Sequence, residues 1–228
     1  MKNMLWIRHG QASLGTDNYD RLSDHGQHQS EKLGRFLGAD GPPLLVHGPL
    51  ERQRHTAALI AKGMVEAGAD APDVEEDSGL REYPAFKLFA HALPQFEGHE
   101  QVKLLSDGDA TQHHPRLFKW LMQRWVNGEI NLDDTDILSF VNFKENVKAS
   151  FERLLLRARE TEVAAVSSGG PIGVALGLAL SLSDDMSMEM AWRVSNSSVA
   201  RYRVEDGKPF LSGFHHHHHL NDDEVTFI

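Results

Sequence analysis

The sequence predicts an α/β fold of three layers (α/β/α), with a mostly parallel sheet and one helical insertion. Two observations lead to this prediction. Short apolar runs alternate along the chain with segments of helical periodicity, a pattern typical of a sheet that helices cover on both faces. The clearly apolar runs also end in polar residues followed by glycine. These polar residues are therefore expected at the carboxyl ends of the strands, where open α/β sheets bind ligands.

Five runs are expected to form the strands of the sheet. Three of them are short and almost wholly apolar, as buried strands are. One of the others is acidic, and the last is expected at a sheet edge. In chain order, the expected strands are residues 4–7, 44–46, 74–80, 163–166 and 199–204.

Helices are expected between these strands. Ser23 is an N-cap residue for a helix that residues 38–43 close, and a second helix is expected over residues 50–65. Pro171 suits the first turn of the helix after the last apolar run. Residues 85–160 carry two stripes of apolar side chains in steps of three and four, which predicts a mostly helical insertion. The stripes are Leu117, Trp120, Leu121 and Trp125, then Phe140, Phe143, Val147, Phe151, Leu154 and Leu155.

Length and composition favour one domain over residues 1–228. Hydrophobic residues make up 40% of the chain and charged residues 25%, the balance of a globular protein. A chain of 228 residues buries roughly 70% of the surface that it exposes when unfolded, which excludes intrinsic disorder and small cross-linked scaffolds.

Charge and cysteine content exclude several classes of function. Lys and Arg number 23 and Asp and Glu 33, a net charge of −10 that argues against broad nucleic-acid binding. The absence of cysteine excludes disulfides, iron–sulfur clusters, cysteine-ligated zinc and thiol catalysis. No apolar run approaches the roughly 20 residues of a membrane span. The chain also reaches Arg8 too soon for a signal peptide, so we expect a cytoplasmic protein with no membrane partner.

Four segments carry candidate chemistry, each at the end of a strand or the start of a helix. Arg8 and His9 follow the first strand, Arg52 opens the second helix, Glu82 follows the third strand, and Ser168 follows the fourth. Each alone has an ordinary structural explanation, such as an exposed polar pair or a solvated charge. Together they would meet at one edge of one sheet, which favours a functional site.

These segments together resemble the histidine phosphatase superfamily, also called phosphoglycerate mutase-like. The order and spacing of its motifs agree from residue 4 to about residue 205. The matching motifs are Arg8-His9-Gly10, Pro-Leu-x-Arg-x-x-x-Thr-Ala at residues 49–57, Leu80-Arg81-Glu82, and Ser-x-Gly-Gly-x-Ile at residues 167–172.

The resemblance implies phosphate chemistry. Arg8 and Arg52 would hold phosphate oxygens with their planar guanidinium groups. His9 would attack phosphorus to give a phosphohistidine, and Glu82 would protonate the leaving group. The two arginines disfavour the protonated ring of His9, which keeps a lone pair for attack. No cofactor and no metal is implied. The expected partner is a small phosphorylated substrate, and the insertion at about 85–160 is expected to cover the site.

Ser168 departs from the family pattern, which has a second histidine at this position. Losing one such donor typically costs on the order of 10²–10³ in rate. In one alternative, Ser168 and the backbone N–H groups of Gly169 and Gly170 replace that histidine at a helix start, where anions are favoured. In the other, the chain is a binding module for a phosphorylated ligand or a protein and turns substrate over poorly or not at all. We expect the first, because bacterial phosphatase-type members similar to this chain carry the same Ser-Gly-Gly-Pro-Ile.

A phosphatase is expected rather than a mutase. Glu82-Tyr83-Pro84-Ala85-Phe86 stands where cofactor-dependent phosphoglycerate mutases carry Glu-Arg-His-Tyr-Gly. The physiological substrate and the oligomeric state stay open, with a homodimer as one alternative. Residues 215–219 are all histidine, and we expect them to be a solvated segment rather than a metal site, because five adjacent histidines on a rigid element cannot all bind one ion.

Overall fold

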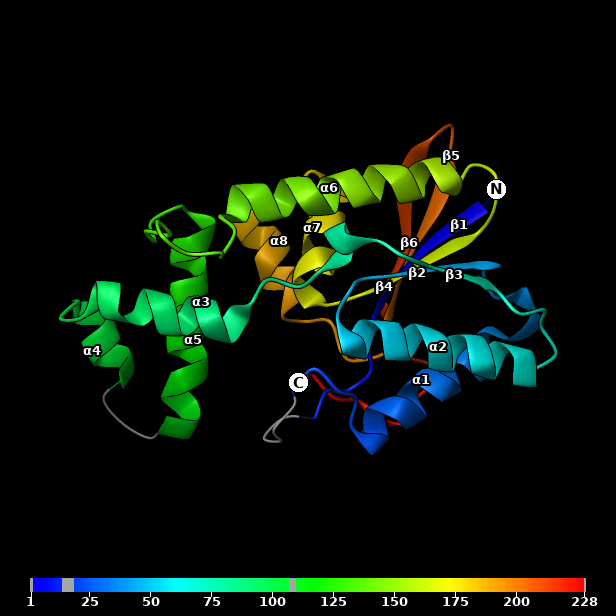
Figure 1. Ribbon diagram of the computed structural model, residues 1–228, viewed down its shortest axis with the longest axis horizontal. Coiled ribbons are helices and arrows are strands. Elements are labelled where there is room, and N and C mark those ends of the chain that lie inside the picture. The colour runs from blue at the N-terminus through cyan, green and yellow to red at the C-terminus, as the bar shows by residue number, and fades with distance from the viewer. Residues whose placement is uncertain (1, 14–18, 107–109, 228) are drawn as a thin grey trace. The chain divides into compact units, whose positions relative to one another are not determined.

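The computed structural model describes residues 2–13, 19–106 and 110–227 (Figure 1). The chain forms two compact units. The first unit consists of Met1–Glu82 and Asn146–Ile228, and the second of Tyr83–Glu145. Within the described ranges, no helix combines the length and the apolar character needed to cross a bilayer.

The first unit is built on one six-stranded mixed sheet, which confirms the predicted fold class. The strand order is β3-β2-β4-β1-β5-β6. The strands from β3 to β1 pair in parallel, and the pairings of β5 with β1 and with β6 are antiparallel. The strands are β1 (Lys2–Arg8), β2 (Leu44–His47), β3 (Asp73–Glu76), β4 (Val163–Ser167), β5 (Val199–Glu205) and β6 (Lys208–His216).

The predicted edge position of the last strand is wrong. β5 lies between β1 and β6, and β6 forms the edge instead. The sequence signal for β6 is weak, because its apolar residues Phe210, Leu211 and Phe214 stand among lysine, proline, serine, glycine and histidine. The acidic strand β3 is the opposite edge, and all four of its residues are exposed, which explains its polar sequence.

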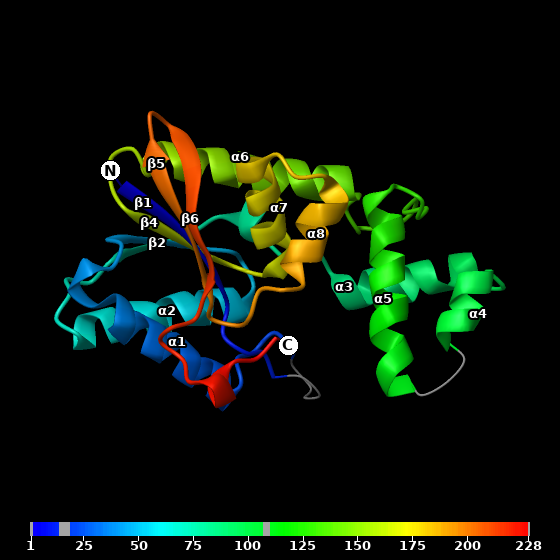
Figure 2. The same ribbon diagram turned by 180° about the vertical axis from the view of Figure 1, so that it is seen from behind.

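Helices cover both faces of this sheet (Figures 1 and 2). On one face, α1 (Asp24–Leu37) and α2 (Glu51–Glu66) pack on β1, β2 and β4. The predicted N-cap is confirmed, since Ser23 accepts a hydrogen bond from the backbone N–H of Gly26. The core on this face contains, among others, Leu5, Ile7, Leu33, Leu45, Ile60, Met64 and Val166.

The other face is covered by α7 (Gly169–Leu180), α8 (Asp184–Ala191) and the part of α6 (Phe140–Arg157) that begins at Asn146 (Figure 2). Here the ring of Trp6 lies 5.9 Å from that of Phe151, centroid to centroid. Since Trp6 alternates with Leu5 and Ile7 along β1, the strand buries a different set of side chains on each face.

The second unit is helical. It contains α3 (Ala85–Ala92), α4 (Glu100–Ser106), α5 (Ala110–Val126) and the first residues of α6. Its core is aromatic: Tyr83 lies 4.8 Å from Trp125 and 5.6 Å from Phe143, between ring centroids. That one domain spans residues 1–228, with an insertion over the site, stays a prediction. Short 3₁₀ turns complete the described chain at Gly38–Asp40, Ser78–Leu80, Leu93–Phe96 and Asp222–Glu224.

Candidate active site

The carboxyl ends of β1 and β4 bring two of the predicted segments together. Arg8 pairs with Ser167 in the parallel register of these strands. The backbone N–H of His9 then donates to the carbonyl of Ser167 at 2.8 Å. His9 and Ser168, which are far apart in the sequence, therefore leave the sheet side by side at the edge where such folds bind ligands.

The His9 loop passes very close to the start of α1. A Cβ atom on Gly10 would lie 2.2 Å from the carbonyl oxygen of Gly26. The backbone N–H of Gly10 donates to the hydroxyl of Thr56 on α2 at 3.0 Å. Because no side chain fits at residue 10, the Arg-His-Gly motif keeps its glycine for packing as well as for ending the strand.

The ring of His9 is buried and held at both nitrogens. Its Nδ1 lies 2.7 Å from the carbonyl oxygen of Gly10, and Arg52 Nε donates to its Nε2 at 3.1 Å. A carbonyl can only accept and a guanidinium can only donate. These partners therefore assign a neutral ring, with the proton on Nδ1 and the lone pair on Nε2.

The surroundings of His9 favour this neutral form. The ring is 3% exposed. Burial, and after it the positive charges of Arg52 and Arg8, hold the pKa of His9 well below its usual value of 6.5, and the bond to Gly10 offsets only part of this. The ring of His9 is therefore neutral across the neutral pH range.

Arg52 is oriented by its other neighbours. It is 8% exposed, and its Nη1 donates to Asp20 Oδ1 at 2.7 Å. The other oxygen of Asp20 accepts from the backbone N–H of Glu51 at the start of α2, at 2.9 Å. The guanidinium also lies over the ring of Tyr19, 5.3 Å from its centroid. These contacts fix the plane of the guanidinium beside Nε2 of His9.

Arg8 is held by backbone carbonyls of the segment that precedes β5. Its Nη1 donates to the carbonyl of Val194, and its backbone N–H donates to the carbonyl of Ser198 at 3.1 Å. Since its charge contributes to lowering the pKa of His9, the structure brings Arg8, His9 and Arg52 into one electrostatic environment.

Ser168 is buried and immediately precedes α7. It is 1% exposed, and its Oγ accepts a hydrogen bond from Gln53 Nε2 at 2.9 Å. Gln53 Nε2 also donates to the carbonyl of Leu80 at 3.0 Å. Since Gln53 supplies a proton to Oγ, the hydroxyl keeps its own proton for donation.

Glu82 meets the N-terminus of α7. Its Oε2 accepts from the backbone N–H of Gly170 at 3.0 Å, which fixes one carboxyl oxygen and orients the other. Gly169 begins the same helix, and a Cβ there would lie 2.9 Å from the carbonyl oxygen of Ala191. The amide of Gly170, one of the two predicted to bind phosphate, thus has a carboxylate partner in this structure.

Several polar residues at this site were not among the predicted ones. Gln53 and Asp20 hold Ser168 and Arg52. Asn196 donates from Nδ2 to the carbonyl of His9 at 3.2 Å. Their sequence signal is weak, because each contacts a residue far along the chain. Gln53 could have been found from its place directly after Arg52 in the helix start.

The histidine run differs from the predicted solvated segment. β6 includes His215 and His216, and His219 is only 9% exposed. The ring nitrogens of His215 and His219 lie 2.8 Å from Ser195 Oγ and 3.0 Å from Ser197 Oγ. The difference arises because alternate residues of the run face the protein while the others face solvent. Among the described residues, no group of three or more His, Cys, Asp or Glu is placed to hold a metal ion.

Comparisons with known proteins agree with this geometry. The sequence profile of the histidine phosphatase superfamily (branch 1) matches residues 4–92. Among curated protein sequences, none gives a significant match. Solved structures with the same fold include phosphoserine phosphatase from Entamoeba histolytica in complex with 3-phosphoglyceric acid. It is 20% identical, with a TM-score of 0.66 over 97% of this chain and 100% of that one.

Two further solved structures share the fold. Phosphoglycerate mutase from Bacillus anthracis is 16% identical, with a TM-score of 0.66 over 96% of this chain and 94% of that one. A mycobacterial glucosyl-3-phosphoglycerate phosphatase with bound VO₃ is 18% identical, with a TM-score of 0.61 over 94% of this chain and 99% of that one.

Proposed function

We propose that this chain is a member of the histidine phosphatase superfamily, whose sequence profile matches residues 4–92, and that it is a phosphomonoester hydrolase acting through a phosphohistidine on His9. The observation that carries the proposal is the state of the His9 ring. Its Nε2 has a lone pair and faces the guanidinium of Arg52 at 3.1 Å, so that a nucleophile and an anion-binding group lie together.

In the first step, His9 Nε2 attacks phosphorus and the P–O bond to the leaving group breaks as the N–P bond forms. Arg52 moves its hydrogen bond from His9 to a phosphate oxygen, and Arg8 binds another. The charge of the transition state is spread over three oxygens, and guanidinium groups fixed before the reaction stabilise it without reorganisation. The bond from His9 Nδ1–H to the carbonyl of Gly10 stabilises the positive charge that develops on the ring.

Glu82 supplies the proton that the leaving alkoxide needs. Because its Oε2 accepts from Gly170, the other oxygen carries the transferred proton. In the second step, water attacks phosphorus, the N–P bond breaks and Glu82 takes a proton back from the water. The enzyme then returns to its starting state and inorganic phosphate leaves.

Ser168 takes the position of the family's second histidine. It contributes a neutral hydroxyl donor, and Gly169 contributes the start of a helix, where anions are favoured. The phosphatase names of two similar structures support hydrolysis. We propose a small phosphorylated substrate, a cytoplasmic location and no cofactor or metal.

The proposal is tested by hydrolysis of p-nitrophenyl phosphate. The wild type is expected to release p-nitrophenol, and His9→Ala to reduce turnover to the background rate. His99→Ala is the matched control: it also removes an imidazole, from the segment that begins α4, and should leave activity unchanged. Equal rates for wild type and His9→Ala would refute the hydrolase. Phosphate binding in calorimetry that persists without turnover would favour the alternative, a non-catalytic phospholigand-binding module.

A further inference from the structure

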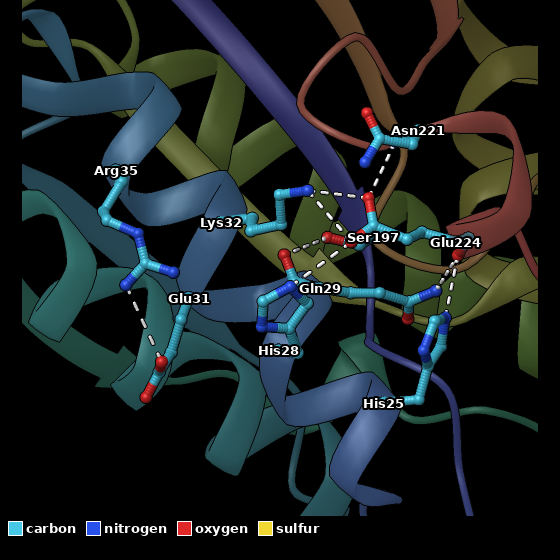
Figure 3. A network of polar contacts seen from close by, with 9 residues as sticks. All are labelled: His25, His28, Gln29, Glu31, Lys32, Arg35, Ser197, Asn221 and Glu224. Carbon is cyan, nitrogen blue, oxygen red and sulfur yellow. Dashed lines mark hydrogen bonds and ion pairs between the residues drawn. The ribbon is translucent and has the colours of Figure 1, made fainter.

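The segment of residues 221–227 is anchored to α1 by a group of charged and polar contacts (Figure 3). The carboxylate of Glu224 accepts from Lys32 Nζ at 2.6 and 2.9 Å, and His28 Nε2 lies 3.3 Å from it. His25 Nε2 lies 2.9 Å from the backbone carbonyl oxygen of Glu224. Three side chains on one face of α1 therefore hold this segment in place.

Thr226 uses its hydroxyl to join two buried amide side chains. Its Oγ1 accepts from Gln29 Nε2 at 3.0 Å and donates to Asn196 Oδ1 at 3.0 Å. The backbone carbonyl of Thr226 also accepts from the N–H of Asn196 at 2.8 Å. Gln29 and Asn196 are both fully buried, so each of their polar atoms needs a partner.

The two amides hold the backbone on either side of the candidate nucleophile. Asn196 Nδ2 donates to the carbonyl of His9 at 3.2 Å. Gln29 Oε1 accepts from the backbone N–H of Gln11 at 2.9 Å. A single amide side chain therefore connects the Thr226 hydroxyl to each end of the loop that carries His9: Asn196 to the carbonyl of His9, and Gln29 to the N–H of Gln11.

The direction of these hydrogen bonds depends on Thr226. Gln29 gives both protons of its Nε2 away, to Thr226 and to the carbonyl of Glu224, so the Thr226 hydroxyl must donate toward Asn196. The acceptor of this hydroxyl is therefore the side-chain carbonyl oxygen of Asn196, and the amide nitrogen Nδ2 points toward His9. Without the hydroxyl, Asn196 Oδ1 is a buried acceptor with a lost partner. A flipped amide would then set two carbonyl oxygens against each other.

We propose that Thr226 is a positioning residue for His9, acting through Asn196 and Gln29 to fix the loop of residues 9–11 for attack on phosphorus. This inference rests on the proposed function and deepens it. A segment that lies more than 200 residues from His9 in the sequence would then help to orient the nucleophile. A small misplacement of the reacting groups can cost up to about 10²-fold in rate, without weakening ground-state binding.

The test compares Thr226→Val, which removes the hydroxyl at nearly constant shape, with Thr226→Ser, which keeps it. With p-nitrophenyl phosphate, Thr226→Val should lower kcat by about 10-fold or more and leave KM within about twofold. Thr226→Ser should restore kcat. In ¹H–¹³C spectra, the ring signal of His9 should shift or broaden in the valine variant and return in the serine variant. Thr161→Val, in the turn before β4, is the matched control and should change neither quantity.

An unchanged kcat and an unchanged His9 signal in Thr226→Val would overturn the inference while leaving the hydrolase intact. A wild type without His9-dependent turnover, but with a His9 signal that follows the Thr226 hydroxyl, would overturn the hydrolase and leave the positioning role. Should Thr226→Val not fold, Glu224→Gln loosens the same segment from Lys32, and the same selective loss of kcat is expected. Wild-type kcat in Glu224→Gln would then contradict the inference.

Discussion

Replacing His219 by glutamine is expected to remove a pH-dependent part of the stability of the fold. The His219 ring is 9% exposed, and its burial, reinforced by the charges of His217 and Lys32, lowers its pKa from 6.5 to about 4. In the unfolded chain the ring returns to the ordinary value. Between these two values the unfolded state binds more protons than the folded state, so stability rises with pH there. The contribution of His219 is complete above pH 6.5 and is lost as the pH falls through about 4.

The magnitude follows from the two pKa values. Integrating the difference in bound protons from pH 7 to pH 5 gives a loss of about 2 kcal/mol from this one ring. Glutamine places a polar atom near the hydroxyl of Ser197 but does not titrate. Urea unfolding of both proteins at the two pH values measures the difference, because other titrating groups, including His9, are common to both. If wild type and His219→Gln lose the same free energy of unfolding between pH 7 and pH 5, the assigned burial of His219 is incorrect.

Three further predictions concern the site. Arg52→Gln should lower kcat by about 10²–10³-fold. It should also move the acidic limb of the pH profile of kcat/KM to higher pH, because the pKa of His9 rises when the charge of Arg52 is lost. A limb at the same pH as in the wild type would contradict the placement of Arg52 beside His9. Glu82→Gln should slow hydrolysis of an alkyl phosphate far more than that of p-nitrophenyl phosphate, whose leaving group needs no proton, and equal losses would exclude Glu82 as the acid. Ser168→Ala should lower kcat about 10-fold or more through loss of a donor, and it should lower the free energy of unfolding by about 1–3 kcal/mol because Gln53 loses a buried partner. Wild-type kcat would leave Ser168 with a structural role only.

The strands that form the centre of the sheet could be predicted because their signal is local. Residues 4–7 and 163–166 are buried on both faces, so they are continuously apolar, and glycine ends each run. The helix that begins after Ser23 could be predicted for the same reason, because its N-cap residue is a local signal. β6 and α8 escaped prediction. β6 is an edge strand in which exposed residues mostly alternate with half-buried ones, and α8 is a short helix of mixed composition.

Only those residues of the candidate site that stand in a recognisable local motif could be predicted from the sequence. His9, Arg52 and Ser168 stand out by residue type at the ends of expected elements. Their partners do not, because tertiary contacts over long separations select them. The bond from Gln53 to Ser168 spans 115 residues, and that from Asn196 to His9 spans 187. Neither separation leaves a periodic pattern in the sequence, so these supporting residues emerge only once the sheet brings the strand ends together.

Trapping the covalent intermediate tests directly whether His9 is the nucleophile. The protein is mixed with radiolabelled phenyl phosphate, quenched in alkaline detergent during turnover, and the label is located by peptide mass spectrometry. We expect a phosphoryl group on Nε2 of His9 that is stable to alkali, is lost in acid and is absent from His9→Ala. Steady release of phosphate with no labelled protein, or label that persists in His9→Ala, would contradict this expectation.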